Sequence, residues 1–587
     1  MPQRRNQMMT EELKAYLFAE EKPNEAQERS LHNFIIETLG HDTEIEWEKS
    51  DKYSGGFALK IGETLYDWST KGRLRQLRDA VTGVSASEEV IPLIKDKLSE
   101  WTPKAMAEEV GEVLTVGDGI VTISGLRHVT YGEILLFEDG TRGMALDLRP
   151  NEIGCILFDD DECIKEGSSV RRTGKTAGVP VGNAFLGRVV NALGVPIDGG
   201  GAIARTGYRP IESPAPGILD RQPVNEPLET GIVTIDSMFP IGRGQRELII
   251  GDRQTGKTSI ATDTIINQKG KGVICIYVAI GQKTSLVSRL CETLYKNGAM
   301  DYTIVVSASA ADSPSLQYIA PYAGCAMGEY FMNKGQDVLI IYDDLTKHAV
   351  AYRSISLLLE RSPGREAYPG DVFYLHSRLL ERSAHLSDDL GGGSMTALPI
   401  VETQEGDVSA YIPTNIISIT DGQIFLETDL FFAGQRPAVN VGLSVSRVGG
   451  DAQTKAMKKA AGSIRLDLAQ FREMEVFTQF STDMDESTKN QLTYGNGIME
   501  MLKQPQNHPY TQDEEVIMLT VAQYTRFKGI AVKDVKKFIA GVTAYIKETN
   551  PNLIERINST GRIEDIDRQD ITSAADKYLA RFVKSAG

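Results

Sequence analysis

Residues 248–258 read Leu-Ile-Ile-Gly-Asp-Arg-Gln-Thr-Gly-Lys-Thr, an apolar run followed by the pattern Gly-x-x-x-x-Gly-Lys-Thr. In such a loop, backbone N–H groups surround phosphate oxygens, the lysine places its charge between the β- and γ-phosphates, and the last hydroxyl helps to hold Mg²⁺. A helix predicted from Ser259 to Gln268 would direct its positive N-terminal end at the phosphates. The segment therefore predicts a nucleoside triphosphate site rather than a Gly-rich turn between core elements, with these binding residues: Gly251, Asp252, Arg253, Gln254, Thr255, Gly256, Lys257 and Thr258.

A second Gly-Lys-Thr occurs at residues 174–176. It lacks the earlier glycine of the pattern, an apolar strand before it and a helix after it. We interpret it as a loop with no phosphate-binding role.

Length and composition limit the classes of function. The chain has 587 residues, of which 41% are hydrophobic and 24% charged, enough for three or four domains. Its net charge of −17 disfavours nucleic acid or anionic lipid as a general partner. The five cysteines show no Cys-x-x-Cys spacing, which indicates buried, inert thiols and no structural zinc. We find no signal or transit peptide and no apolar run long enough to span a bilayer, so we expect membrane contact only through partners.

The pattern of the chain changes twice. Short β-type runs between turns from 111 to 172 predict a small barrel. From 234 to 447, apolar strands alternate with helical stretches, which predicts a mostly parallel sheet covered by helices, and beyond 453 the chain reads as a helical bundle. With an N-terminal α+β extension, the predicted order is extension, β-barrel, α/β P-loop domain and helical domain, at residues 1–83, 108–178, 179–452 and 453–587, with a linker and helix at 84–107.

Two further strand ends complete the predicted site. The apolar run 338–342 ends at Asp343, where a carboxylate orients a water on Mg²⁺, so Thr258 and Asp343 are the predicted metal residues. The run 273–280 leads to Gln282, at the place where many P-loop ATPases carry the glutamate that activates water. An amide cannot take a proton at neutral pH, so a site with Gln282 there would bind ATP without useful turnover. Gln282 as a mere strand-end cap, with the base elsewhere, remains the alternative.

Five motifs together resemble the alpha subunit of the rotary F-type ATP synthase. They are GDRQTGKT at 251–258, AIGQK at 279–283, IIYDDL at 340–345, RSPGRE at 361–366 and VGLSVSRV at 441–448. The resemblance runs from about Ser85 to the C-terminus. It implies a head of alternating alpha and beta subunits around a gamma shaft, attached to the cytoplasmic face of the membrane through other subunits that include a delta/b peripheral stalk. It also implies that ATP or ADP binds with Mg²⁺ at a non-catalytic site.

The same resemblance assigns residues outside the P-loop. It implies that Arg447, with Ser444 nearby, serves the catalytic site of the neighbouring beta subunit, where a planar cation would neutralise charge on the transferred phosphoryl group. A surface salt bridge is the alternative for Arg447. The residues that the resemblance places around adenine are Phe431, Arg436, Pro437, Gln504 and Gln506.

The first ~80 residues depart from that family, whose alpha subunits begin near the equivalent of Ser85. Residues 55–69 alternate apolar and polar residues across a Gly-Glu turn, and a helix is predicted from Arg73 to Val81. This stretch resembles the C-terminal part of the delta subunit of the same enzyme, and a helix from Glu11 to Leu39 would precede it. We predict a separately folding adaptor for the stalk; a solubilising extension is the alternative.

Two other classes of function remain open at this stage. One is a self-sufficient homohexameric motor, such as a secretion ATPase or a Rho-like RNA translocase; the acidic charge disfavours RNA, and Gln282 disfavours any enzyme that hydrolyses ATP alone. The other is a nucleotide-stabilised scaffold without a catalytic contribution. The leading hypothesis is a non-catalytic, ATP-binding subunit of a proton- or sodium-translocating ATP synthase.

Overall fold

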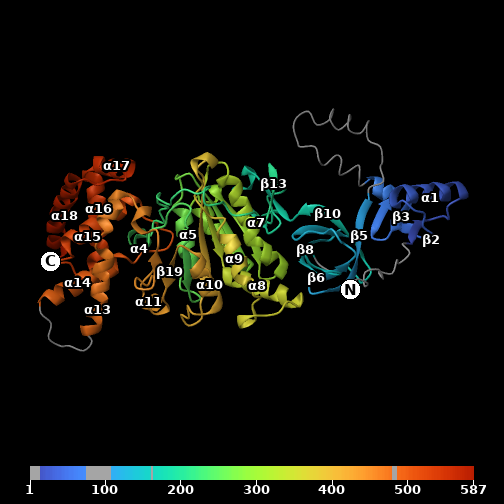
Figure 1. Ribbon diagram of the computed structural model, residues 1–587. Coiled ribbons are helices and arrows are strands. Elements are labelled where there is room, and N and C mark those ends of the chain that lie inside the picture. Colours follow the sequence, from blue (N-terminus) through green and yellow to red (C-terminus); the bar gives the residue numbers. More distant parts are fainter. Residues whose placement is uncertain (1–13, 75–106, 160–162, 479–485, 587) are drawn as a thin grey trace, which may run out of the picture. The chain divides into compact units, whose positions relative to one another are not determined.

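The computed structural model describes residues 14–74, 107–159, 163–478 and 486–586. The chain divides into two compact units, residues 1–177 and 178–587 (Figure 1). The first holds the N-terminal sheet and the barrel. The second holds the P-loop sheet and the C-terminal helices. This order confirms the predicted fold class.

The N-terminal sheet has the strand order β4-β3-β1-β2. Its elements are β1 (Ala15–Ala19), α1 (Glu25–Leu39), β2 (Ile45–Lys49), β3 (Phe57–Ile61) and β4 (Thr64–Asp67). Strands β1 and β2 are parallel and joined by α1, and β3 and β4 form the predicted hairpin. Arg73 and Leu74 are helical, but the rest of the helix predicted from Arg73 to Val81, and most of the linker at 84–107, lie outside the described residues.

The helix predicted from Glu11 to Leu39 is wrong over its first part, because the chain forms β1 there. Side chains alternate in this strand, and Ala15, Leu17 and Ala19 are buried. A period of two places these residues on one face, where they pack under α1. Asn24 then starts the helix by accepting a hydrogen bond from Gln27 N (2.9 Å).

The barrel is closed, with strand order β10-β7-β8-β9-β6-β5 and a final pairing of β10 with β5. Its strands are β5 (Ala107–Gly117), β6 (Ile120–Ser124), β7 (Glu133–Phe137), β8 (Arg142–Leu148), β9 (Ile153–Leu157) and β10 (Ser169–Thr176). Strand β5 also pairs with β4, so the N-terminal sheet and the barrel share one strand. The N-terminal segment predicted to be an adaptor therefore does not form a sheet separate from the barrel.

The second Gly-Lys-Thr lies inside β10, so our interpretation of it as a loop is wrong. The register of β10 against β7 shifts between Arg172 and Thr176, which marks a bulge. Arg172 donates to both carboxylate oxygens of Glu133 and to Glu109. The segment thus joins strands of the barrel, and β11 rather than a helix follows it.

The second unit is built on an eight-stranded sheet, order β12-β16-β15-β17-β18-β14-β19-β20, parallel except for β20. The strands are β12 (Val189–Asn191), β14 (Leu248–Gly251), β15 (Val273–Gln282), β16 (Thr303–Ser309), β17 (Asp337–Asp343), β18 (Ser394–Glu402), β19 (Gly422–Leu426) and β20 (Val445–Ser446). A small ribbon pairs β11 (Gly178–Val181) with β13 (Gly207–Pro210). The helices of this part are α4 (Val233–Met238), α5 (Lys257–Ile266), α6 (Thr284–Lys296), α7 (Pro314–Met332), α8 (Leu345–Leu358), α9 (Val372–Leu380), α10 (Tyr411–Ile419) and α11 (Thr428–Phe432).

The C-terminal part is helical, as predicted. Its helices are α12 (Lys455–Ala461), α13 (Ile464–Thr478), α14 (Glu486–Met501), α15 (Gln512–Thr525), α16 (Val535–Thr549), α17 (Pro551–Thr560) and α18 (Asp565–Ala586). The single helix predicted over 456–480 is wrong, because the chain breaks between α12 and α13.

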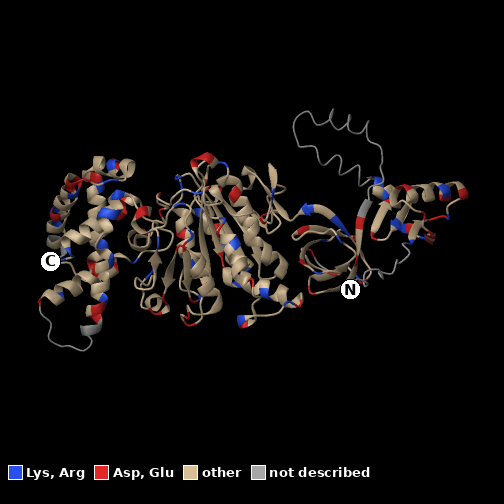
Figure 2. Ribbon diagram, viewed as in Figure 1, with Lys and Arg blue, Asp and Glu red and all other residues tan. Residues whose placement is uncertain are grey.

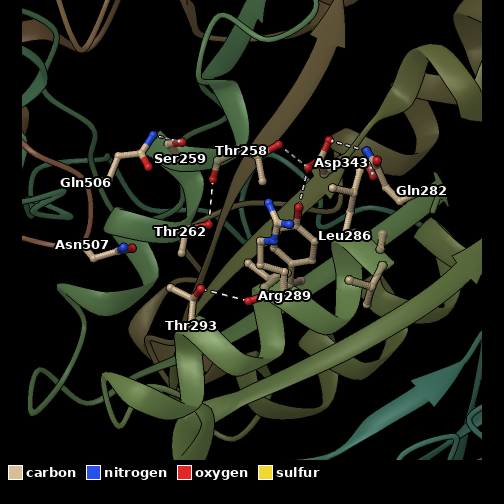
Figure 3. A pocket seen from close by; sticks show the side chains of 14 residues that line it. Thr258, Ser259, Thr262, Gln282, Leu286, Arg289, Thr293, Asp343, Gln506 and Asn507 are labelled. Carbon is tan, nitrogen blue, oxygen red and sulfur yellow. Dashed lines mark hydrogen bonds between the residues drawn. The ribbon is translucent and has the colours of Figure 1, made fainter. Parts of the chain in front are cut away.

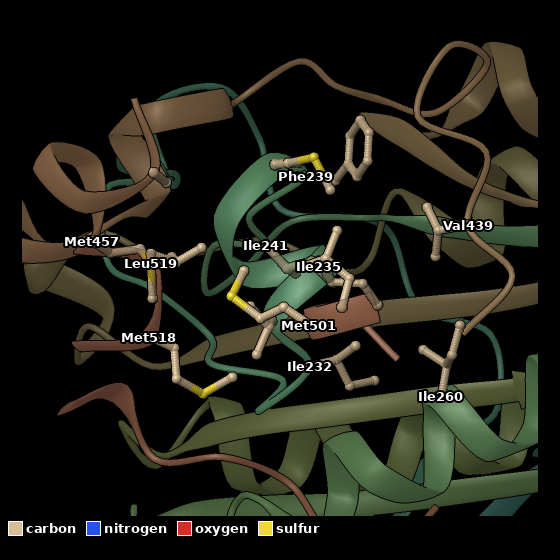
Figure 4. Packing of buried hydrophobic residues seen from close by; sticks show 14 of the residues in the cluster. Ile232, Ile235, Phe239, Ile241, Ile260, Val439, Met457, Met501, Met518 and Leu519 are labelled. Atoms are coloured by element: carbon tan, nitrogen blue, oxygen red, sulfur yellow. The ribbon is translucent and has the colours of Figure 1, made fainter. Parts of the chain in front are cut away.

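One apolar core joins these helices to the sheet. In Figure 4, Ile235 and Phe239 of the α4 segment lie among Met457, Met501 and Leu519 from three C-terminal helices. All five side chains are at least 96% buried. The sheet and the bundle therefore stabilise each other through a shared interior rather than a polar domain boundary.

Charges on the C-terminal helices alternate in sign (Figure 2). Lys547 pairs with Asp513 and Glu514, and Arg556 pairs with Asp567. Such interleaving is typical of a solvated surface and differs from the basic stripe of a nucleic-acid-binding face.

Candidate nucleotide site

The predicted site residues lie at the carboxyl edge of the sheet. Strands β15, β17, β18 and β14 are consecutive and parallel, with Ala279 beside Asp343 and Gly251 beside Glu402. Parallel strands end together, so the P-loop, Asp343 and Gln282 meet at one edge of the sheet. The loop from 251 to 256 leads directly into α5, which begins at Lys257 rather than at Ser259.

Asp343 is the centre of a hydrogen-bonded cluster. Its Oδ2 accepts from Thr258 Oγ1 (2.8 Å) and from the hydroxyl of Tyr277, and its Oδ1 accepts from Gln282 Nε2 (3.1 Å). Burial raises the pKa of Tyr277 well above its ordinary value, and the nearby Asp343 adds to this effect, so the phenol remains a donor. The structure thus brings together the two predicted metal residues and Gln282. A threonine hydroxyl beside a carboxylate is a donor set that suits Mg²⁺.

Lys257 is buried inside the loop. Its Nζ donates to the backbone carbonyls of Gly251 (2.8 Å) and Asp252 (2.5 Å). Burial lowers the pKa of Lys257, while the carboxylates of Glu402 and Asp344 act in the opposite direction. The lysine therefore lies within the curve of the loop, where a phosphate would meet it.

Asp252 anchors the P-loop through hydrogen bonds to neighbouring segments. Its carboxylate accepts from Thr403 Oγ1 (2.6 Å), Gly406 N (2.9 Å) and Thr428 Oγ1 (2.8 Å). Burial alone would raise the pKa of Asp252, but these hydrogen bonds outweigh it and hold the pKa below its ordinary value. The loop is thereby tied to the segments that follow β18 and β19.

The remaining loop residues differ in exposure. Arg253 is mostly exposed and pairs with Glu402 (3.0 Å). Gln254 has a φ of 64°, a left-handed conformation that a tight phosphate loop requires. Thr255 is buried and donates to Asp252 O (2.8 Å).

A cavity of about 330 Å³ adjoins Asp343 and lies between α5 and α6 (Figure 3). Thr258 and Thr262 line it from α5, and Leu286, Arg289 and Thr293 line it from α6. The guanidinium of Arg289 points into this cavity in Figure 3. The space has an apolar wall on α6 and a polar end at the Asp343 cluster.

A second, smaller cavity lies on the other side of the α5 N-terminus. All five residues predicted to surround adenine line it, together with Ser259 and Asp263: Phe431, Arg436, Pro437, Gln504 and Gln506. The guanidinium of Arg436 lies 4.4 Å from the centre of the Phe431 ring. Gln504 is fixed by the backbone, since its Nε2 donates to Gly231 O (2.7 Å) and His508 O (2.9 Å). An aromatic ring and amides around a small space can recognise a flat heterocycle.

Arg447 is not brought to the P-loop. It directly follows β20, which pairs with Gly422 at the first residue of β19, and its backbone N donates to Asp421 O (2.9 Å). Because β19 runs parallel to β14, Arg447 lies at the amino edge of the sheet, opposite the P-loop. Its side chain is exposed, whereas Ser444 is buried and its hydroxyl accepts from Phe425 N (3.0 Å).

Sequence reasoning missed several residues of the site. Tyr277 is one residue of an apolar run, and only its place opposite Asp343 gives it a role. Ser259 and Asp263 face the second cavity from α5, where the i, i+4 spacing is the single available signal. Burial raises the pKa of Asp263 to about 6, and its carboxyl accepts from Asn507 N (2.8 Å).

The fold and site define a P-loop nucleotide-binding protein with a barrel before the sheet and a helical end after it. Three models of one family match these parts in order: the beta-barrel domain (residues 106–174), the nucleotide-binding domain (231–446) and the C-terminal domain (453–578) of the ATP synthase alpha/beta family. The chain belongs to the ATP synthase alpha/beta family, with the alpha subunits as its relatives. It is thus a subunit of the ATP synthase complex, and the family resemblance expected from the motifs is confirmed.

Similar proteins cover most of the chain. It is 57% identical over 499 residues to ATP synthase subunit alpha of Acetivibrio thermocellus, which covers 85% of this chain and 99% of that one. It is 60% identical over 495 residues to the same subunit of Clostridium botulinum, covering 84% and 97%. Among the residues that the structure describes, no helix has the length and apolar character to cross a membrane.

Proposed function

We propose that this chain holds MgATP in its own P-loop site without hydrolysing it and supplies Arg447 to the catalytic site of a neighbouring beta subunit. The observation that supports the first half is the orientation of Gln282, whose amide nitrogen faces Asp343 Oδ1 at 3.1 Å. An amide can position a water but cannot accept its proton. Thr258 and Asp343 would hold Mg²⁺, whose charge would neutralise the phosphates.

The acidic groups near the P-loop are already engaged. Asp344 is fully buried, accepts from Lys347 N (2.8 Å) and pairs with Lys347 Nζ (2.9 Å), and burial raises its pKa to about 6. Glu402 pairs with Arg253. Asp343 accepts from three side chains. Each carboxylate has a structural partner that competes with a role as general base.

The isolated chain tests this half of the proposal. MgATP should raise its melting temperature, while phosphate release stays at the background rate. Gln282→Glu is the informative variant, because it restores a carboxylate at the same position with nearly the same volume. Robust turnover by the unmodified chain would overturn the non-catalytic assignment.

The place of Arg447 supports the second half. An exposed guanidinium at the sheet edge opposite the P-loop is out of reach of this chain's own nucleotide, yet available to another subunit. Planar, permanently charged arginine suits a transferred phosphoryl group. The assembly we propose alternates this chain with beta subunits around a gamma shaft, on the cytoplasmic face of the membrane.

For the N-terminus we propose attachment to the delta/b peripheral stalk. Residues 1 to about 83 precede the part that the family models match, and the β3–β4 hairpin contains the stretch on which the expected resemblance to the delta subunit rests. The proposed functional boundaries are residues 1–83, 84–107, 108–178, 179–452 and 453–587.

A further inference from the structure

Ile218 and Leu219 form an exposed apolar pair that the proposed function does not use. The two residues are 92% and 93% exposed, and no other large apolar residue that the structure describes exceeds 78%. Apolar residues that stand singly on a surface need no explanation, but two adjacent ones that are almost fully solvated are unfavourable unless another molecule covers them. We refer to Ile218 and Leu219 as the apolar tip.

The loop below the apolar tip is held in one conformation by hydrogen bonds. Asp220 Oδ2 accepts from Gly217 N (2.8 Å), and Asp220 O accepts from Ser387 N (2.8 Å). Arg221 Nε donates to the carbonyl of Pro216 (3.2 Å). The apolar tip therefore stands on a fixed base, and a loop that already has one conformation loses little entropy when a partner binds it.

Charged side chains connect this loop to the backbone of Arg447. Arg221 Nη2 donates to Glu381 Oε2 (3.0 Å), and Glu381 Oε1 forms an ion pair with Arg246. Arg246 then donates from Nε and Nη2 to the two carboxylate oxygens of Asp421 (3.0 and 2.9 Å), a bidentate arrangement that fixes both groups. The carbonyl oxygen of Asp421 accepts from Arg447 N (2.9 Å). We call the four side chains from Arg221 to Asp421 the ion-pair network.

The loop that carries the apolar tip and the segment that carries Arg447 lie at the same edge of the sheet. Arg221 pairs with Leu386 in an isolated bridge, and the preceding His385 pairs with Ser394, the first residue of β18. Arg447 follows β20, which is three strands away from β18 in the sheet. At the usual spacing of neighbouring strands, these two anchor points are roughly 14 Å apart. An interface of standard size is roughly 30 Å across, so one interface can include both.

Apolar residues also accompany Arg447 on its own segment. Leu443, Val445 and Arg447 are exposed, whereas Ser444 is buried. This alternation places the three exposed side chains on one side of the segment that includes the edge strand β20. An arginine beside apolar side chains is typical of the centre of a protein interface. The segment around Arg447 therefore has the composition of a protein-docking surface.

We propose that the apolar tip inserts into an apolar pocket of the neighbouring beta subunit, and that the ion-pair network holds Arg447 at a fixed position relative to this contact. This inference rests on the proposed function of Arg447, whose target lies in the same subunit. The apolar tip then fixes where the two subunits meet, and Asp421 is the positioning residue that passes this placement to the Arg447 backbone. A guanidinium displaced by about 1 Å loses much of its effect on a transferred phosphoryl group, so this support contributes to turnover.

The double variant Ile218→Ser, Leu219→Ser tests the apolar tip in full-length chains assembled with beta and gamma subunits. The isolated variant should keep its melting temperature and its affinity for MgATP, because both residues are solvated in the isolated chain. The concentration of beta subunit needed for half-assembly should rise about tenfold or more, since the burial of two aliphatic side chains is lost. Ile566→Ser is the matched control, because Ile566 is 62% exposed on α18; it should assemble normally. Unchanged assembly with beta, or a loss confined to gamma binding, would overturn the contact.

Asp421→Asn tests the ion-pair network, because it keeps the size of the side chain and removes the charge that binds Arg246. We expect the kcat of the assembled complex to fall about tenfold, with the KM for ATP and the affinity for beta within about twofold. A role in folding alone would lower turnover in any background. A positioning role requires Arg447, so Asp421→Asn should have little further effect when Arg447→Ala is also present. Additive losses, or an unchanged kcat, would overturn the role of the network.

Two further results assign a failure to its cause. Arg221→Gln cuts the network at the loop and should lower kcat about threefold. Where Asp421→Asn does not assemble, an unchanged kcat of Arg221→Gln overturns the role of the network. Full turnover by Arg447→Ala would overturn the proposed function of Arg447 and the role of the network with it, whereas the assembly measurement on the apolar tip is independent of that result.

Discussion

Gln506 Nε2 donates a hydrogen bond of 2.9 Å to Ser259 Oγ, and both residues line the two cavities that flank the start of α5. Gln506 belongs to the segment after α14, whereas Ser259 belongs to the helix that begins at the P-loop. One hydrogen bond therefore connects the helical part of the chain to the nucleotide site, and its two residues border both the cavity beside the Asp343 cluster and the cavity beside Phe431.

The first prediction concerns that bond. Ser259→Ala and Gln506→Ala should each weaken ATP binding to the isolated chain by about fivefold, the usual effect of one lost hydrogen bond. The double variant should be no weaker than either single variant, because both remove the same interaction. Titration calorimetry gives the affinities. Thr293→Val is the control, since its hydroxyl donates to Arg289 O in its own helix (2.9 Å). Independent, additive losses would contradict the prediction.

Removal of the metal tests the second pair of residues. Thr258→Ala should weaken the binding of MgATP by about tenfold, the typical cost of disturbing a metal site. Binding of ATP in excess chelator should change little, because Thr258 then holds no metal. Thr262→Val removes a hydroxyl one turn later, bonded to Thr258 O (2.8 Å), and serves as control. Equal losses with and without Mg²⁺ would show that Thr258 contacts the nucleotide directly.

Arg447→Lys should lower steady-state hydrolysis by the assembled complex about a thousandfold or more, the range found for arginine fingers. Lysine keeps the charge but lacks the planar fork that contacts two oxygens at once. Binding of ATP to the isolated chain should be unaffected, because the P-loop lies at the other edge of the sheet. Near-normal turnover would make Arg447 an ordinary surface residue.

Glu515 leads to a prediction about stability and pH. Burial, reinforced by Asp236 and Glu229, raises the pKa of Glu515 well above its ordinary value. The folded state therefore holds a proton that the unfolded chain releases, and stability is lost as pH rises from the unfolded toward the folded pKa. Glu515→Gln should raise the free energy of unfolding at pH 8 and have a smaller effect at pH 5, as measured by denaturant titration.

The matched control for that prediction is Glu514→Gln, one residue earlier, where the carboxylate pairs with Lys547 (2.9 Å). It should give no stabilisation at pH 8, because it removes an ion pair rather than a buried charge. An equal effect of Glu515→Gln at the two pH values would mean that folding does not change the protonation of this carboxyl group, and would contradict the prediction.

Deletion of residues 1 to about 83 should leave ATP hydrolysis by the soluble complex unchanged, release it from membranes and uncouple it from ion pumping, because these residues are proposed to bind the stalk. The deletion also leaves residues 107–109 of β5 without their partners in β4. Membrane sedimentation and proton-pumping assays measure the outcome. A truncated enzyme that stays attached and pumps normally would contradict the stalk proposal.

The strongest sequence signals were local. The loop at 251–258 and the apolar runs before Asp343 and Gln282 could be predicted from neighbouring residues alone. Parallel strands then bring Thr258 and Asp343 to one edge of the sheet. The alternating pattern from Ala15 to Ala19 is only five residues long and lies close to a strong helix signal, so the sequence alone suggests that the helix extends over it. Strand β1 forms because β2 and β3 pair with it on either side.

Some site residues that become neighbours only in the folded chain could not be predicted from the sequence. Tyr277 lies in an apolar strand, and nothing within ten residues of it indicates that its hydroxyl faces Asp343. Ser444 stays a predicted contributor to the neighbouring site, although its buried hydroxyl holds the β19 segment. The break between α12 and α13 at Gly462 and Ser463 was missed because both flanking stretches have helical periodicity.

Strand β5 has a mechanical consequence. Its first three residues bond to β4 and its remaining length closes the barrel, so a single covalent backbone passes from one sheet into the other. A sideways pull on the N-terminal sheet would reach the barrel as tension along a peptide chain, resisted by a row of antiparallel hydrogen bonds loaded together. Side-chain contacts between two separate domains would slip under the same torque one at a time. An element anchored in this way can transmit twist with little compliance, a property that a stationary support needs when a shaft turns against it.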